Sequence, residues 1–185
     1  MGKLGVFLFT SLDGYYKDAN GTTEWHKHGG EDEGKLSDEG AQSGNTLVFG
    51  RVTYEMMAGF WPSPMAHEMF PTVADGMNKA DKIVFSKKLK KAEWPNTKII
   101  SGDMVKEMKK LKQSSNSNFT ILGSGSVVTQ LSDAGLIDDY MFLVDPIAIG
   151  EGTSMFQGLT KHLNLKLVSS KAFKSGAVLN NYIKQ

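Results

Sequence analysis

The stretch that decides the fold is Thr46–Met57, TLVFGRVTYEMM, in which a short apolar run stops at a glycine and a helix begins. The run Leu47–Phe49 predicts a strand covered on both faces, because only such a strand is continuously apolar. The segment Val52–Ala58 predicts the first turns of a helix. Of the 21 lysines and arginines in the chain, Arg51 is the single arginine, and it lies at this turn between strand and helix.

A second segment has the same design. The apolar run Phe119–Leu122 is followed by Gly123, Ser124, Gly125 and Ser126, and then by the expected helix Val127–Leu131. A helix N-terminus carries unpaired N–H groups and attracts anions, and glycine lets a ligand approach the backbone. Both turns fall at carboxyl ends of strands, where open α/β sheets bind ligands. The alternative is that each turn only joins a strand to a helix.

Two charged residues and a serine sharpen the anion hypothesis. The planar guanidinium of Arg51 can bind a phosphate through two parallel hydrogen bonds, which lysine cannot do. The alternative for this residue is an ion pair with Glu55. Ser86 and Lys87 follow the expected strand Lys82–Phe85 and could hold a further phosphate, such as the 2′-phosphate that distinguishes NADP from NAD. The alternative here is a solvated, lysine-rich turn.

The rest of the chain predicts one α/β domain over residues 1–185. Strands expected at residues 4–9, 47–49, 82–85, 98–100, 119–122 and 140–144 alternate with helices, which favours parallel pairing. Apolar residues spaced by four predict a single helix over residues 66–79. Two alternating segments, residues 163–172 and 177–183, predict an antiparallel hairpin at the C-terminus.

Composition excludes several classes of function. The net charge of +1 offers no broad field for nucleic acid or an anionic membrane, so neither is expected as a partner. The chain has no cysteine, which excludes disulfides and cysteine-based zinc sites. His26 and His28 form an H-x-H pair, but the chain has only 4 histidines, and we expect no metal. The first apolar run is too short for a signal peptide, which predicts a soluble cytoplasmic protein.

The motifs together resemble a known family. The segments SLDG, LVFGRVTYE, KIVFSKKL, ILGSGSVVTQL and IDDYMFLVDPIAIGEGTSMF occur in the order found in the dihydrofolate reductase-like superfamily. The closer resemblance is to the reductase domain of the bifunctional riboflavin-biosynthesis deaminase-reductase. It implies a three-layer α/β/α fold with a mostly parallel mixed sheet, an antiparallel C-terminal hairpin and NADPH bound along the strand ends. Many members of the family are homodimers, so a homodimer is expected.

The resemblance also implies residue roles. Gly50, Arg51 and Thr53 would line the pyrophosphate and 2′-phosphate region, and Ser86 with Lys87 would hold the adenosine phosphate. The segment Gly123–Ser126 would cover the pyrophosphate and the nicotinamide. The implied activity is NADPH-dependent hydride transfer to a small heterocyclic or ribosyl substrate, such as 5-amino-6-(5-phosphoribosylamino)uracil.

The sequence departs from parts of the family. Folate reductases use an arginine to bind the substrate's glutamate, and the single arginine here is assigned to the cofactor. Dihydrofolate reductase proper is therefore the less favoured alternative. The deaminase half is absent, since a chain without cysteine lacks the zinc ligands of that domain.

The substrate side is less defined. Asp13, Trp25 and Trp61 are predicted to bind substrate, and Asp32 or Glu33 to donate a proton. Each has an alternative: Asp13 as a turn residue, Trp25 as a core anchor, and the acids as a solvated face. A non-catalytic nucleotide-binding protein on the same fold is the main alternative function, and a nucleotide hydrolase is a weaker one.

Overall fold

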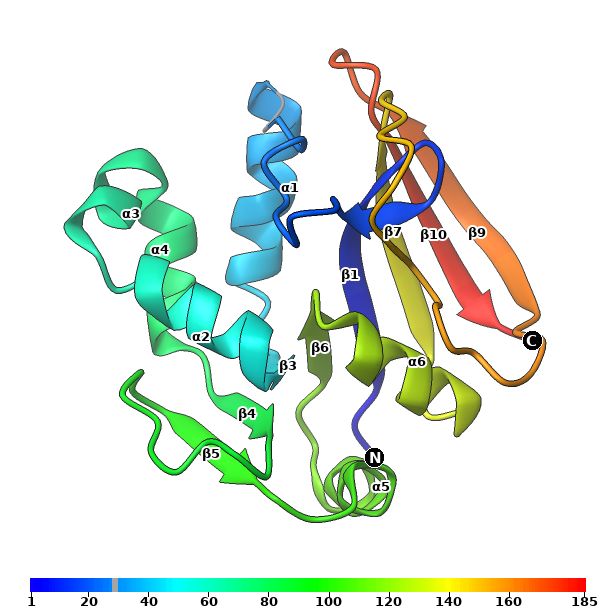
Figure 1. The fold of residues 1–185 in the computed structure, drawn as a ribbon. Coiled ribbons are helices and arrows are strands. Elements are labelled where there is room, and N and C mark those ends of the chain that lie inside the picture. Colours follow the sequence, from blue (N-terminus) through cyan, green and yellow to red (C-terminus); the bar gives the residue numbers. More distant parts are fainter. Residues whose placement is uncertain (28–29) are drawn as a thin grey trace.

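The computed structural model describes residues 1–27 and 30–185, which contain an eight-stranded sheet with the order β5-β4-β3-β6-β1-β7-β10-β9 (Figure 1). A second sheet has two short strands, β2 and β8. The strands are β1 (Leu4–Ser11), β2 (Tyr15–Lys17), β3 (Thr46–Gly50), β4 (Lys82–Phe85), β5 (Thr97–Ile100), β6 (Phe119–Leu122), β7 (Asp139–Asp145), β8 (Thr153–Ser154), β9 (Leu165–Ala172) and β10 (Val178–Lys184). The helices are α1 (Glu31–Ala41), α2 (Arg51–Phe60), α3 (Pro64–Met69), α4 (Pro71–Lys79), α5 (Met104–Ser114) and α6 (Gly125–Asp133).

The large sheet is mostly parallel. Strands β5, β4, β3, β6, β1 and β7 pair in parallel, and β10 and β9 continue the sheet as antiparallel strands. This confirms the predicted mixed sheet and its C-terminal hairpin. Because the parallel strands share one direction, their carboxyl ends meet at one edge, and the residues that follow them are brought together there.

Helices cover both faces of the sheet. Along β3, Val48 packs in one core cluster with residues of α5 and α6, such as Met108 and Val128. Its neighbours Leu47 and Phe49 pack in a second cluster with α2 and α4. Successive side chains of a strand point to opposite faces, so this division places helices on both sides and gives the predicted three layers.

One helix prediction is wrong. Residues 66–79 do not form a single helix, because α3 ends at Met69 and α4 begins at Pro71. Proline has no backbone N–H and is suited to the first position of a helix. Phe70 between them leaves the helical conformation, with φ −141° and ψ 61°. The apolar spacing continues across this break, which is why periodicity alone predicted one helix.

No helix in the part of the chain that the structure describes is long and apolar enough to cross a membrane.

Candidate functional site

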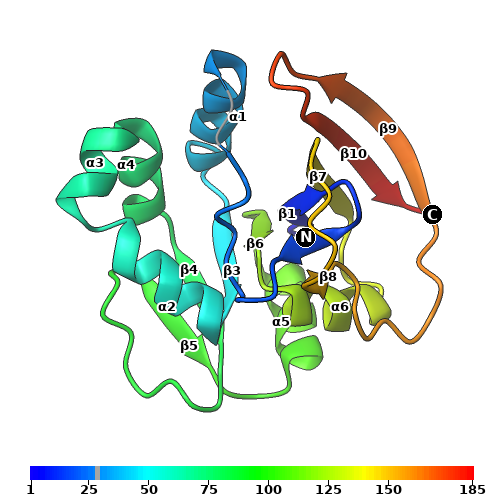
Figure 2. The ribbon, with the colours of Figure 1, turned by 45° about the horizontal axis from the view of Figure 1, so that its top comes forward.

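The two glycine turns lie next to each other. Strands β3 and β6 are parallel neighbours, with Thr46 opposite Phe119 and Val48 opposite Ile121. The Gly50 backbone N–H donates to the Ser124 hydroxyl oxygen at 2.9 Å, which joins the turns directly. Figure 2 shows α2 and α6 on either side of these two strands. We call residues 50–51 and 123–126 the two-helix cradle.

Both helix starts in the cradle lack a capping side chain. The residue before α2 is Gly50, which has none, and the Ser124 side chain makes no capping bond to α6. Ser124 is instead in the left-handed conformation, with φ 58° and ψ 60°. The first N–H groups of a helix have no partner within it. Two such starts at one edge create a positive electrostatic field that suits an anion.

Backbone geometry explains the glycines of the second turn. Gly123 has φ +65°, a conformation that side chains disfavour, and a Cβ there would lie 3.2 Å from the Cγ2 of Thr53. A Cβ on Gly125 would lie 2.5 Å from the Tyr16 hydroxyl. Thr53 is buried on α2, where it packs under the glycine turn. Its predicted contact with cofactor stays a prediction.

Arg51 lies at the cradle and pairs with its own helix. Its Nη1 donates to Glu55 Oε2 at 2.6 Å, and both side chains are partly exposed. The alternative ion pair therefore exists in the structure. A guanidinium carries several N–H donors, so one contact with Glu55 leaves others for a phosphate. Surface ion pairs of this kind contribute little stability, and exchange of one partner for an anion costs little.

A cavity of about 380 Å³ lies beyond the ends of β4 and β5. It is lined by Phe85, Ser86, Lys87, Ile100, Ser101, Gly102, Asp103, Met104, Val105 and Gln130. The structure thus brings the predicted pair Ser86 and Lys87 together with a residue of α6. Ser86 Oγ accepts hydrogen bonds from the N–H groups of Lys88 and Leu89, so the hydroxyl also shapes its own turn.

Asp103 and Gln130 also line this cavity, and neither was predicted to belong to a site. The Asp103 carboxylate accepts a hydrogen bond from the Lys106 N–H at 2.9 Å and caps α5. Gln130 lies within α6, and nothing local distinguishes it from a surface residue. The parallel pairing of β4 with β5, and the position of α6, place them there.

Asp13 holds two loops together. Ser11 donates to its carboxylate at 2.6 Å, and the N–H groups of Gly150 and Ile149 donate at 2.8 and 3.1 Å. The Ser11 hydrogen bond, followed by that from Gly150, holds the pKa of Asp13 below its usual value. Its role is wider than the turn residue weighed as an alternative, because it joins the loop after β1 to the loop after β7. Its contact with substrate stays a prediction.

A buried histidine–aspartate pair lies beside this loop junction and was not predicted. His26 Nδ1 lies 2.7 Å from Asp145 Oδ2, and the two side chains are 4% and 8% exposed. The imidazole also stacks on Phe9, with ring centroids 3.8 Å apart. Sequence reasoning had considered His26 only as a metal ligand. His28, the other member of that pair, lies outside the described residues.

The two predicted tryptophans have different surroundings. The Trp25 indole nitrogen is buried and has no hydrogen-bond partner among the described residues. Trp61 donates to the Met57 sulfur at 3.0 Å and packs edge-on against Phe60 and Phe70, at the junction of α2 with α3. The predicted contacts of Trp25 and Trp61 with substrate stay predictions.

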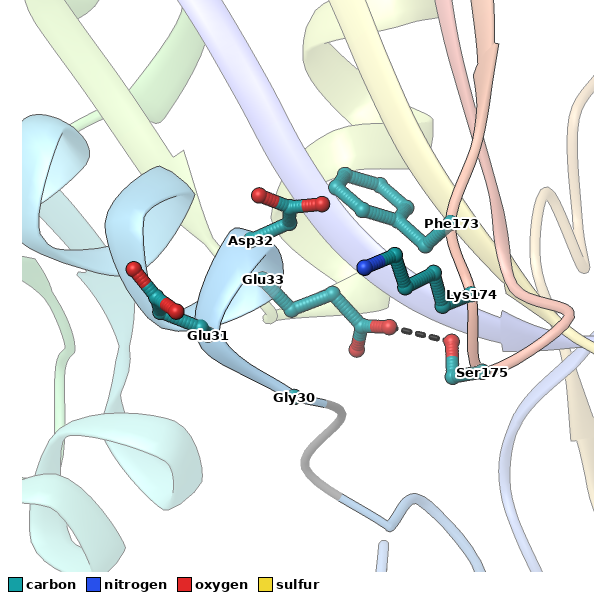
Figure 3. A pocket seen from close by; sticks show the side chains of 7 residues that line it. All are labelled: Gly30, Glu31, Asp32, Glu33, Phe173, Lys174 and Ser175. Atoms are coloured by element: carbon teal, nitrogen blue, oxygen red, sulfur yellow. Dashed lines mark hydrogen bonds between the residues drawn. The ribbon is translucent and has the colours of Figure 1, made fainter.

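The predicted acids line a separate, small cavity of about 110 Å³ at the start of α1 (Figure 3). Its lining is Gly30, Glu31, Asp32, Glu33, Phe173, Lys174 and Ser175. Glu33 is buried and accepts a hydrogen bond from the Ser175 hydroxyl in the hairpin turn, whereas Asp32 is exposed. The two acids therefore differ: one connects α1 to the hairpin, and the other faces solvent.

A metal centre has no support in the part of the chain that the structure describes. There, no three histidine, aspartate or glutamate side chains gather closely enough to hold an ion.

Comparison with known proteins places this geometry in a family. The sequence matches the family described as the RibD C-terminal domain across residues 3–179. The fold is similar to that of a protein from Shewanella sp. PV-4 named for riboflavin biosynthesis, with TM-score 0.78, 21% identity and 99% of both chains covered.

Two further solved structures are similar. A dihydrofolate reductase from Enterococcus faecalis, complexed with NADP(H) and RAB-propyl, gives TM-score 0.67 and 17% identity, over 100% of this chain and 97% of that one. The Thermotoga maritima diaminohydroxyphosphoribosylaminopyrimidine deaminase/5-amino-6-(5-phosphoribosylamino)uracil reductase gives TM-score 0.67 and 13% identity, over 100% of this chain and 57% of that one. At these identities, the structures establish a dihydrofolate reductase-like fold.

Proposed function

The chain belongs to the RibD C-terminal domain family, and on this premise we propose that it is an NADPH-dependent reductase of a small heterocyclic or ribosyl substrate. The observation that carries the proposal is the Gly50–Ser124 hydrogen bond, which sets two uncapped helix starts side by side. The cavity with Ser86 and Lys87 adjoins them through Gln130 of α6. The pyrophosphate of a dinucleotide would bind at the two helix starts, and its adenosine phosphate would bind in the cavity.

The residues present fit such a cofactor. Gly123 and Gly125 keep the backbone of the cradle free of side chains, and a Cβ at either position would meet a neighbouring side chain. The guanidinium of Arg51 and the ammonium of Lys87 supply positive charge on each side. The cavity of about 380 Å³ falls in the range of roughly 300–1,000 Å³ found for small-molecule sites.

When bound, the reduced nicotinamide supplies the hydride, and the protein's task is to position both reactants and exclude water. Asp13 fixes the loops after β1 and β7 to each other at the carboxyl edge of the sheet. The His26–Asp145 pair fixes the segment before α1 to the end of β7. We propose that these two connections form the wall of the substrate site, with Trp25 and its unpaired indole N–H beside it.

We propose that a residue at the start of α1 donates the proton that completes the reduction. Asp32 and Glu33 are the proposed candidates, and their environments suit different roles. Glu33 is held by Ser175 and positions the helix against the hairpin, whereas the exposed Asp32 can exchange protons with solvent. Replacing Asp32 with Asn should therefore lower turnover more than it lowers cofactor affinity.

One observation favours the non-catalytic alternative. The cavity beside Asp32 and Glu33 has a volume of about 110 Å³, which is smaller than sites that hold a heterocyclic substrate. A protein that retained the cofactor cradle without a substrate site would bind nucleotide and reduce nothing.

The test is a titration with NADPH and NADH, followed by fluorescence of the 3 tryptophans. Saturable binding of NADPH is the expected result, and no binding of either nucleotide would overturn the proposal. The bound protein is then mixed with pterins, aminouracil ribosides with and without a phosphate, and small cyclic imines. Substrate-dependent NADPH oxidation supports the reductase, and binding without oxidation of NADPH by any of them supports the alternative.

A further inference from the structure

We infer that Asp103 is a selectivity residue of the adenosine cavity, where its carboxylate opposes Lys87 and weakens the preference for a 2′-phosphate. This inference rests on the proposed function. It predicts that the affinities for NADPH and NADH differ less than they would if Lys87 were the only charged residue in the cavity. The ligand class is an adenosine ribose with or without a 2′-phosphate.

The sheet brings the two charges to one cavity. Strands β4 and β5 are parallel, with Val84 opposite Ile99 and Phe85 opposite Ile100. The Ser86 N–H donates to the Ile100 carbonyl at 3.0 Å and extends this pairing beyond the strands. The segments 86–87 and 101–103 therefore follow neighbouring strands at the same edge, and both line the cavity.

The Asp103 carboxylate is fixed in position. Its Oδ1 accepts a hydrogen bond from the Lys106 N–H at 2.9 Å and so caps helix α5. Rotation of the side chain would break this cap, which is a destabilising change. The same bond uses one carboxylate oxygen and leaves the second available to a ligand.

The charge of Asp103 is not neutralised by its counterpart. Within residues 1–27 and 30–185, no ion pair joins Lys87 to Asp103. The nearby Glu107, by contrast, pairs with Lys110 at 2.7 Å. The wall of the cavity thus includes one lysine and one aspartate that form no ion pair with each other.

The two charges act differently on the two cofactors. A 2′-phosphate is an anion that Lys87 attracts and Asp103 repels, so the two effects partly cancel. A 2′-hydroxyl is a hydrogen-bond donor, and an acidic residue is the usual acceptor for it in proteins that bind NAD. Asp103 therefore lowers the affinity for NADPH and raises the affinity for NADH.

Asp103→Asn tests this with little change to the fold, because asparagine caps a helix about as well as aspartate. We expect the variant to bind NADPH about five-fold more tightly, in line with the loss of one nearby charge in a partly solvated cavity. NADH affinity should stay the same or fall by about two-fold as the acceptor weakens. Glu107→Gln is the matched control, since it removes a carboxylate of the same helix outside the cavity and should leave both affinities unchanged.

Fragments separate this inference from the proposed function. Adenosine 2′,5′-bisphosphate and adenosine 5′-monophosphate differ by the one phosphate at issue, and calorimetry measures both without any turnover. If Asp103→Asn binds the bisphosphate more tightly than wild-type protein does, and the monophosphate equally well, the inference is supported. Wild-type protein that binds NADPH while the variant binds it equally or more weakly overturns the inference alone. Wild-type protein that binds neither dinucleotide overturns the proposed function and this inference together.

Discussion

The two sides of the site are built by different means. The two-helix cradle is made of backbone at the ends of neighbouring strands, and its central contact joins Gly50 to Ser124. The proposed substrate side is made of side chains that connect distant segments: Asp13 to the backbone of Gly150, His26 to Asp145, and Glu33 to Ser175. The cradle therefore exists once the sheet has formed, whereas the substrate side exists only while three separate connections hold.

This difference predicts different responses to mutation. Changes on the substrate side should cost stability, because they remove side-chain hydrogen bonds between distant segments, two of which involve buried side chains. Changes in the cradle should cost cofactor affinity, because the proposed cofactor would contact the groups there. The variants below test this separation by measuring both properties for each.

The largest effect is expected for Asp145→Ala, which removes the carboxylate that buried His26 contacts. We expect the free energy of unfolding to fall by about 3 kcal/mol, because the variant loses a hydrogen bond between two buried polar side chains. NADPH affinity should change less than about two-fold at a temperature where the variant is folded. Urea denaturation measures the first quantity and fluorescence titration the second.

Asp133→Ala is the control, because it removes a partly exposed carboxylate that accepts hydrogen bonds from the N–H and the hydroxyl of Thr160. In this variant the free energy of unfolding should fall by less than about 1 kcal/mol. If Asp145→Ala were no more destabilising than this control, the His26–Asp145 pair would not anchor the loop.

The next effect is a dependence of stability on pH. Lys82 is buried at the start of β4, where its Nζ donates to the carbonyls of Met77 and Ala80. Burial lowers its pKa to about 8, and the charge of Asp81 opposes that shift. In the unfolded chain the pKa returns to 10.5. Between these values the unfolded chain binds more protons, so the unfolding free energy should rise with pH.

The rise should amount to roughly 2 kcal/mol between pH 8 and pH 9.5. Above pH 10 the sign reverses for Tyr16 and Tyr140, whose pKa burial raises, so the measurement stops below that pH. Lys82→Met should remove the rise. A wild-type profile that is flat, or that matches the variant, would contradict the assignment.

The cradle could be predicted from the sequence because its information is local. Leu47–Phe49 followed by Gly50 predicts a strand and a turn without reference to any other segment, and the same holds for Phe119–Gly123. Parallel pairing then brings the turns to one edge. The boundary between α3 and α4 was missed although Pro71 signals it locally, because the apolar period was given more weight than the proline.

The substrate side could not be predicted in this way. Nothing in the segment around His26 indicates Asp145, and nothing around Glu33 indicates Ser175, because each pair forms only after distant segments meet. The H-x-H spacing suggested only a metal site, which was not expected, and it gave no indication of the buried pair. Asp103 was missed for a related reason: its capping role is local and visible, while its place in the cavity depends on β4.

A cradle substitution should show the opposite pattern to Asp145→Ala. In Gly125→Ala the added methyl would lie 2.5 Å from the Tyr16 hydroxyl and at the start of α6. We expect NADPH affinity to fall about ten-fold, because Tyr16 and the helix start must separate, with a smaller loss of stability of about 1 kcal/mol. Gly40→Ala is the control, since a Cβ there meets nothing within 4 Å. Equal NADPH binding by both variants would remove Gly125 from the cofactor site.

The smallest change, Arg51→Lys, tests the separation most sharply. Its ion pair with Glu55 is partly exposed, so the free energy of unfolding should change by less than about 0.5 kcal/mol. NADPH affinity should fall about five-fold and NADH affinity about two-fold, because lysine keeps the charge but loses the planar pair of donors. Glu55→Gln keeps the arginine and releases it from its partner, so it should leave NADPH binding unchanged or tighter. An equal loss of NADPH and NADH in Arg51→Lys would place the guanidinium on the shared pyrophosphate, and Ser86 with Lys87 would then carry recognition of the 2′-phosphate alone.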